Sequence, residues 1–245
     1  MGLSSNIIWH QTTYNGLKAI LHCKAFKPSY SLETIRWKGS VRDVAFPMIS
    51  FCDIPIADMH EYIEKYGNYT IGMKRDWGQK ERLSPVWYRD ITSSTLGEQM
   101  DLFKNILGKE AFKLEEMEKI LWNIIAYTKN TEGELRKRNY KSYRFQDEKE
   151  VRFVPAYDEL VQKGVAPFLS KDAYDKMHDE GSTIIGQMEV SFDIADIAYI
   201  LVSKRNQIGK VKKLLEGRTE NITFLSSRQI RQEIIGLSHN RLKNK

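Results

Sequence analysis

Between Glu148 and Phe153, charged residues alternate with bulky ones, and this alternation strongly limits how the chain can fold. Side chains on a β-strand point to opposite faces in turn, so the pattern predicts a strand with one apolar face that can be buried. The other face carries Glu148, Glu150 and Arg152. Two carboxylates at this spacing repel each other, so at least one needs a cation or a ligand hydroxyl as its partner. The pattern fits either a solvated face with one Glu–Arg pair or a site where a carboxylate acts on a ligand.

Length and composition indicate a folded chain of mixed structure. The chain has 245 residues, of which 41% are hydrophobic and 11% aromatic. A chain of this size can bury a core without disulfides, and this composition excludes wholesale disorder. We therefore expect a single domain over residues 1–245, with a helical insertion at about 96–130.

Cysteine usage, hydropathy and charge suggest where the protein works and with what. Cys23 and Cys52 lie in different segments, and no Cys/His cluster has metal-ligand spacing, so we expect a reducing cytoplasm and no metal. The first residues lack the pattern of a secretion signal, and no apolar run reaches the length of a membrane span, so we expect no membrane partner. A net charge of +6 and a pI near 9.1 favour a polyanionic partner.

Hydrophobic periodicity and turn residues predict an α+β fold with strands from distant parts of the chain around one core. The segments at 27–43 and 128–145 are polar and are predicted to be loops, and two helices with a break near Gly108 are predicted between 96 and 128. The predicted strands are 6–10, 45–53, 69–74, 85–89, 148–153, 188–192, 197–202 and 222–225. The other predicted helices are 14–23, 57–66, 157–164, 171–180, 206–215 and 227–242.

Several polar side chains are placed where they could form a site. His10 and Thr12 lie where the first strand ends, although a lone histidine is more often a hydrogen-bonded structural residue. Ser50 interrupts an apolar strand and needs a hydrogen-bond partner, which the backbone supplies in most proteins. A carboxylate of the Glu148/Glu150 pair could grip a ribose hydroxyl and stabilise positive charge at an anomeric carbon. A nicotinamide-like leaving group would need a pocket, and side chains suited to line it are His10, Tyr30, Ser50 and Phe51.

Two families share these patterns. The segment from Trp9 to Leu21 resembles the His-x-Thr, Asn-Leu, Ile-Leu opening of DarT-like ADP-ribosyltransferases. The stretch from Pro47 to Pro55 resembles the AbiGi family of phage abortive-infection proteins, and the likeness extends over residues 9–155. Further positions that carry the AbiGi likeness are His60, Tyr66, Gly67, Tyr69, Ile71, Gly72, Trp77, Pro85, Val86 and Tyr88. The Glu-x-Glu-x-Arg strand fits both families and is similar to the Glu-x-Glu motif that many ADP-ribosyltransferases place beside NAD.

The transferase resemblance implies an ADP-ribosyltransferase-like split β-sheet with NAD lying across it as co-substrate. Glu150 would hold the nicotinamide ribose and stabilise an oxocarbenium-like transition state, while Glu148 would orient or deprotonate the nucleophile, or the two roles are reversed. The implied cofactor-binding residues are His10 and Thr12 on the ribose or amide, Tyr30 stacking on the ring, Ser50 at the pocket floor, Phe51 in the pocket lining, and Arg36 or Arg42 on the pyrophosphate. No second tyrosine or first-strand arginine matches the two known subclasses, which leaves the subclass open.

The acceptor implied by this resemblance is a nucleic acid. The segment before the Glu-x-Glu strand is basic and aromatic, a combination suited to RNA or single-stranded DNA, because cations neutralise phosphates and rings stack on unpaired bases. A solvated basic linker is the alternative. The candidate nucleic-acid-binding residues are Arg136, Lys137, Arg138, Tyr140 and Tyr143.

The sequence also allows functions other than a transferase that modifies nucleic acid. The AbiGi resemblance implies an antitoxin partner of a nucleotidyltransferase-like toxin, which would work by binding a toxin or a nucleic acid without catalysis. The transferase reading would make the chain a phage-defence toxin, held in check by its own antitoxin. A metal-dependent nuclease using Asp147, Glu148 and Glu150 is disfavoured, because the sequence clusters no further carboxylate with them.

Overall fold

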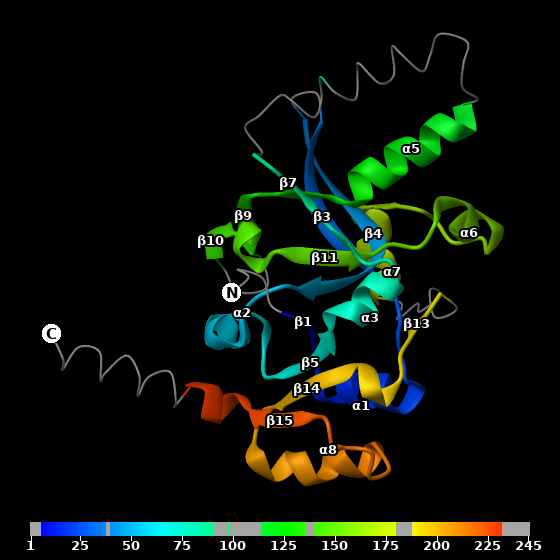
Figure 1. Cartoon of the computed structure of the whole chain (residues 1–245). Helices are drawn as coiled ribbons and strands as arrows, with labels where there is room; N and C mark the ends of the chain where they lie inside the picture. Colours follow the sequence, from blue (N-terminus) through cyan, green and yellow to red (C-terminus); the bar gives the residue numbers. More distant parts are fainter. Residues whose placement is uncertain are drawn as a thin grey trace, which may run out of the picture. The chain divides into compact units, whose positions relative to one another are not determined.

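A computed structural model describes residues 6–37, 40–90, 98, 114–135, 140–179 and 188–231 (Figure 1). The fold is α+β, as predicted, with a multistranded mixed sheet and several helices. The chain divides into two compact units, described separately below. Unit 1 comprises residues 1–26, 50–83 and 190–245, and unit 2 comprises residues 27–49 and 84–189. The ADP-ribosyltransferase-like sheet and the single domain stay predictions.

Unit 1 is built on a sheet in which the first strand, β1, is central. β1 pairs antiparallel with β5 along its whole length, with His10 opposite Ile71, and with the end of β4, where Trp9 faces Cys52. β14 extends the sheet antiparallel to β5, and β15 follows in parallel. The strands are β1 (Ile7–Thr12), β4 (Ser40–Cys52), which enters from unit 2, β5 (Tyr69–Lys74), β14 (Ile197–Val202) and β15 (Thr223–Ser226).

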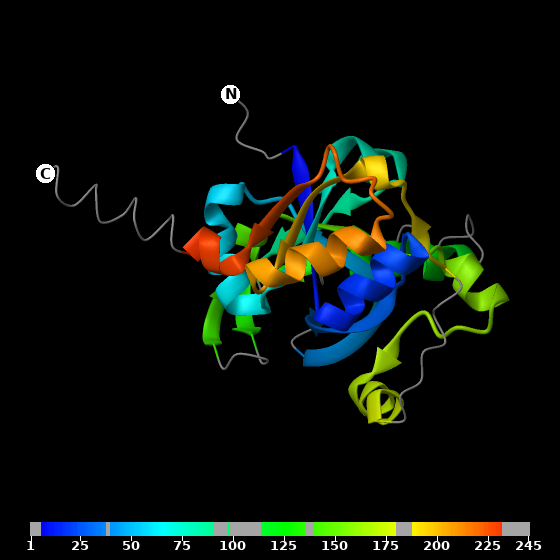
Figure 2. The same ribbon diagram turned by 90° about the horizontal axis from the view of Figure 1, so that it is seen from below.

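Short elements connect and cover this sheet. α1 begins after Thr13, whose side chain accepts a hydrogen bond from the amide of Gly16 at 3.0 Å. α1 and α8 lie side by side (Figures 1 and 2). The helices are α1 (Tyr14–Cys23), η1 (Ile56–Asp58), α2 (Met59–Tyr66), α3 (Arg75–Lys80), η4 (Ile194–Asp196), η5 (Arg205–Gln207) and α8 (Ile208–Leu214), and a small pair joins β2 (Ala25–Phe26) to β13 (Val190–Ser191).

The alternation of side chains along β1 gives unit 1 apolar packing on both faces of the sheet. Trp9 is fully buried and packs with Met59 and Ile63 of α2 on one face. Ile8 points to the other face, where a Cβ on Gly78 of α3 would lie 2.7 Å from its Cδ1. A larger residue at position 78 would therefore require the end of the Ile8 side chain to shift.

Unit 2 holds strands of the mixed sheet, two separate strand pairs and several helices around a second core. A long hairpin pairs β3 (Ser29–Trp37) with β4, and β12 (Leu169–Ser170) pairs with β4 as well. Three further pairs are β11 (Glu150–Phe153) with β6 (Ser84–Pro85), β7 (Trp87–Arg89) with β8 (Thr128–Asn130), and β9 (Glu132–Leu135) with β10 (Tyr140–Arg144). The helices are α5 (Leu114–Ala126), η3 (Phe145–Glu148), α6 (Tyr157–Gln162) and α7 (Lys171–Asp179). Their core includes Ile35, Phe46, Met48, Trp122, Ala126 and Leu160.

The two predicted loops are strands in the structure. Residues 29–37 form β3, because β4 offers a partner of matching length and pairs with it over its whole length. Residues 128–130, 132–135 and 140–144 form β8, β9 and β10, whose polar side chains obscure the period-two pattern. The predicted strand at 148–153 begins only at Glu150, because η3 takes up Glu148. Most of the predicted helical insertion and the end of the predicted C-terminal helix lie outside the described residues.

Candidate functional site

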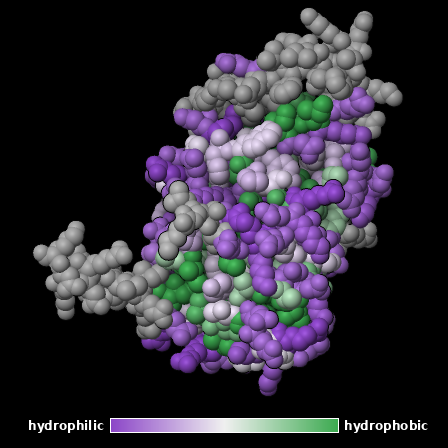
Figure 3. Space-filling model, viewed as in Figure 1, coloured by the Kyte–Doolittle hydropathy of each residue, from purple (hydrophilic) through white to green (hydrophobic). Residues whose placement is uncertain are grey.

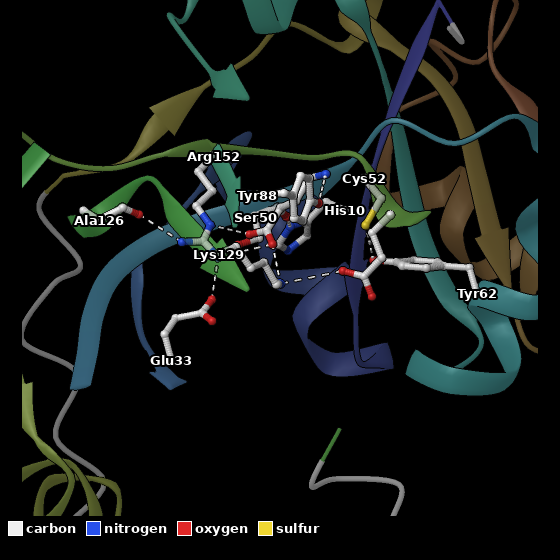
Figure 4. A network of polar contacts seen from close by, with 11 residues as sticks. His10, Glu33, Ser50, Cys52, Tyr62, Tyr88, Ala126, Lys129 and Arg152 are labelled. Atoms are coloured by element: carbon white, nitrogen blue, oxygen red, sulfur yellow. Dashed lines mark hydrogen bonds and ion pairs between the residues drawn. The ribbon is translucent and has the colours of Figure 1, made fainter. Parts of the chain in front are cut away.

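Glu150 and Arg152 form the centre of a buried polar network in unit 2. They are two residues apart on β11, so their side chains share a strand face. Arg152 donates from Nε to Oε1 of Glu150 at 2.5 Å and from Nη2 to Oε2 at 3.2 Å. Its Nη1 donates to the carbonyl of Ala126 at 2.9 Å, and its Nη2 also donates to Glu33 at 2.5 Å (Figure 4). Arg152 is 0% exposed and Glu150 3% exposed, so the pair lies in the interior.

Lys129 supplies the second cation of this network. Its Nζ donates to Oε2 of Glu150 and lies 3.7 Å from a carboxylate oxygen of Glu148, which is also buried. The same Nζ stands over the ring of Phe145, 4.8 Å from the ring centre. We call Glu33, Lys129, Glu148, Glu150 and Arg152 the charge network.

Tyr88 of β7 contacts the charge network. The register of β7 and β8 sets Tyr88 beside Lys129, and the Tyr88 hydroxyl accepts a hydrogen bond from the amide of Glu150 at 2.8 Å. Burial raises the pKa of Tyr88, so its hydroxyl stays neutral. The hydroxyl therefore satisfies the buried backbone of β11.

The electrostatics of the network keep its central groups charged. Burial alone would raise the pKa of Glu150, but the charges of Arg152 and Lys129 and their hydrogen bonds outweigh it and lower that pKa below its usual range. Burial alone would lower the pKa values of Lys129 and Arg152, but the neighbouring carboxylates, Glu150 foremost, raise both. Both oxygens of Glu150 are thus occupied by cations, and the carboxylate is held as part of the protein interior.

The sequence prediction of a Glu–Arg pair is confirmed, but its surroundings are not those expected. The pair is Glu150 with Arg152. It was expected on a solvated strand face, but it is buried. Three members of this site were missed, namely Glu33, Tyr88 and Lys129. Glu33 and Lys129 lay in segments predicted to be loops, and only their period-two spacing within polar strands could have revealed them.

Of the four residues predicted to line one pocket, His10, Ser50 and Phe51 come together in unit 1, whereas Tyr30 belongs to unit 2. Nδ1 of His10 lies 3.0 Å from the carbonyl oxygen of Ser50, and because a carbonyl only accepts, Nδ1 carries the proton. The rings of Phe26 and Phe51 lie 5.0 Å and 5.3 Å from the His10 ring. Burial lowers the pKa of His10, and the hydrogen bond to Ser50 opposes this only in part. His10 is therefore a neutral histidine within an aromatic cluster.

The other predicted cofactor-binding residues are distributed over both units. In unit 1, Thr12 ends β1, and its Oγ1 is so close to Gly16 that a Cβ there would lie 2.1 Å from it. In unit 2, the hydroxyl of Tyr30 donates to the carbonyl of Ala166 at 2.6 Å. Arg42 is exposed on β4, and Arg36 belongs to β3, its side chain lying outside the described part.

The predicted nucleic-acid segment is only partly described. Residues 136–138, which hold Arg136, Lys137 and Arg138, lie outside the described residues. Tyr140 is 44% exposed on β10, whereas Tyr143 is buried with its ring 5.2 Å from that of Phe145. Arg144 of β10 pairs with Glu132 of β9 at 3.7 Å, and the two strands together hold two cations and two glutamates. The described part of this hairpin therefore carries no excess of positive charge.

Within the described ranges, no group of three or more His, Cys, Asp or Glu side chains could hold a metal ion. The described helices include none with both the length and the apolar character needed to cross a membrane. No curated protein and no solved structure matches the chain. NAD as co-substrate stays a prediction.

A protein-family model described as "Putative abortive phage resistance protein AbiGi, antitoxin" matches residues 23–203. The description names an antitoxin, which points to a non-enzymatic role, so the expectation of an ADP-ribosyltransferase is wrong. The match reaches further toward the C-terminus than the likeness recognised in the sequence, which ended at residue 155. Because the matched region covers most of the 245 residues, the chain belongs to the AbiGi family of abortive phage resistance proteins.

Proposed function

We propose that the chain is a non-catalytic antitoxin that neutralises a partner toxin protein by binding it. The observation that carries this proposal is the state of Glu150, whose two carboxylate oxygens are occupied by Arg152 and Lys129 in the interior of unit 2. The antitoxin description of the family agrees with it.

A carboxylate that acts on a substrate has to face it with an oxygen free to bind or to accept a proton. Glu150 is 3% exposed, and its pKa is lowered by the two cations, so it is a poor base. Withdrawing it from the network would leave Arg152 and Lys129 as buried cations with fewer partners, which is strongly unfavourable. The network therefore suits a fixed scaffold whose surface meets a partner.

Co-expression with a candidate partner toxin, sought among the genes beside the one that encodes this chain, tests the proposal. Cells that make the toxin alone should stop growing, and cells that also make the chain should grow. A tag on the toxin should then retain the chain through purification at a constant ratio, because inhibition by binding requires a lasting complex. The proposal would be contradicted if the chain rescued growth, no complex could be recovered and the toxin were found covalently changed.

A pair of variants separates binding from chemistry. Glu150→Gln keeps the shape of the side chain and removes its charge, and Glu61→Gln makes the same change on the exposed pair with Lys65. If the chain acts by binding, any loss of rescue by Glu150→Gln should follow the amount of folded protein, measured by circular dichroism and by yield. Abolished rescue with undiminished folding and complex formation would indicate a chemical role for Glu150.

A further inference from the structure

The adjacent helices α1 and α8 of unit 1 present cations without carboxylates. No Asp or Glu occurs from Tyr14 to Phe26 or from Ile197 to Leu215. The two helices lie side by side, with η5 leading directly into α8 (Figures 1 and 2). We call the seven cations of these segments the lysine face, and they are Lys18, Lys24, Lys204, Arg205, Lys210, Lys212 and Lys213.

This face gathers more positive charge than the net charge of the whole chain. The chain has a net charge of +6, so without these seven cations its formal charge would be −1. All seven except Lys18 are exposed. Within the described part of the chain, none of the seven forms an ion pair, whereas the nearby Arg218 is neutralised by Glu216 at 2.9 Å. On the face shown in Figure 3, hydrophilic residues line the lower edge, where α8 lies in Figure 1.

The kind of cation indicates the kind of partner. Lysine is depleted in protein–protein interfaces, where arginine and aromatic residues are enriched, and six of these seven cations are lysines. Exposed lysines are effective at neutralising phosphates, because each one releases counterions from a nucleic acid. The composition of the lysine face therefore favours a nucleic acid over a protein partner.

The aromatic rings next to this face indicate the form of the nucleic acid. Lys18 covers the ring of Tyr14 and Lys212 covers the ring of Phe224, each with Nζ 4.9 Å from the ring centre. Binding of single strands relies on exposed rings that stack on unpaired bases, and these two rings are half-buried beneath lysines. We propose that the lysine face binds the phosphate backbone of duplex nucleic acid without reading its sequence. This activity is additional to toxin binding and does not depend on it.

The test is the affinity of the full chain for a labelled DNA duplex of about 30 base pairs, measured by fluorescence anisotropy over a range of salt concentrations. The logarithm of the binding constant should fall linearly with the logarithm of salt, with a slope of about −0.9 for each phosphate neutralised. Changing Lys210, Lys212 and Lys213 together to Ala should reduce that slope by about 2 to 3 and weaken binding at low salt at least tenfold. The affinities of two unrelated duplexes should be equal.

The matched control changes Lys65, Lys163 and Lys171 to Ala, three lysines that each pair with a carboxylate one helical turn away. It removes the same formal charge and should leave the salt slope unchanged. The proposal would be overturned if both triple variants lost duplex affinity equally, or if neither lost any. Tighter binding of single-stranded than of duplex DNA would also overturn it. Loss of toxin neutralisation with intact duplex affinity in the α8 variant would make this face a protein-docking surface instead, while failure of duplex binding alone leaves the antitoxin proposal untouched.

Discussion

Arg152 donates from Nε to Oε1 of Glu150, two residues earlier on β11, across 2.5 Å. Neither side chain has appreciable exposure, and Lys129 occupies the second oxygen of the carboxylate. Because two cations share one buried carboxylate, the pair contributes to the folding of unit 2. Its removal should therefore change stability before it changes any contact with a partner.

Removal of the guanidinium should be strongly destabilising. Arg152→Met leaves Glu33 with one cation fewer and Glu150 with Lys129 alone, and breaking a buried pair in this way costs about 3–5 kcal/mol. Urea unfolding measures the change. Arg218→Met is the matched control, because Arg218 also pairs with a glutamate two residues earlier but in an exposed position, where about 0–1 kcal/mol is expected. Equal effects of the two substitutions would contradict the assigned role of the network.

Glu150 should make unfolding depend on acid pH. Its pKa is lowered in the folded chain because Arg152 and Lys129 outweigh burial, so the folded state binds its proton less readily than the unfolded state does. The contribution of Glu150 to the free energy of unfolding is complete above its unfolded pKa of about 4.3. It is lost as pH falls from there through the pKa of Glu150 in the folded chain. The difference in unfolding free energy between wild type and Glu150→Gln should shrink from pH 6 to pH 3. A difference that stays constant over this range would count against the network.

His10 should add a second pH dependence at higher pH. Burial lowers its pKa, so the unfolded state binds its proton more readily, and stability falls as pH drops below about 6.5 toward the folded value. His10→Asn places an amide N–H near the Nδ1 position, able to reach the Ser50 carbonyl, and cannot titrate. The variant should lose less stability than wild type between pH 7.5 and pH 5, and NMR should place the His10 pKa below its usual value. Parallel stability curves would exclude a His10 whose pKa is lowered by folding.

The start of α1 offers a local test. Thr13 caps this helix through its side-chain oxygen, and Thr13→Ala should destabilise unit 1 by about 1 kcal/mol. Thr13→Ser keeps the oxygen and should restore most of that loss. Thermal unfolding of the two variants decides the matter, and equal melting temperatures for Ala and Ser would show that the cap contributes nothing.

Much of the fold was predictable where local signals were strong. The strand at 69–74 and the helix at 14–23 have the predicted bounds. Both have clear hydrophobic periodicity, and the helix begins at a threonine cap. The segments that became β3, β8, β9 and β10 were predicted to be loops. Their polar residues suit a loop as well as a strand, and only pairing with distant strands decides between the two.

The site was predicted in part. The Glu–Arg pair followed from strand alternation, and His10 and Ser50, which were named as side chains suited to line one pocket, do lie together. Lys129 could not be assigned to Glu150, because they are 21 residues apart and no local pattern brings β8 beside β11. The burial of Glu150, which separates a structural carboxylate from a catalytic one, depends on packing that no local pattern carries.

The stoichiometry of toxin inhibition tests the central claim most directly. Purified toxin, held at a concentration well above the dissociation constant, is titrated with the purified chain while toxin activity is followed. Inhibition by binding predicts a linear fall in activity that ends at a fixed ratio of whole molecules, with full activity recovered once the chain is removed. Complete inhibition at one chain per twenty toxin molecules, persisting after the chain is removed, would show turnover and contradict a non-catalytic antitoxin.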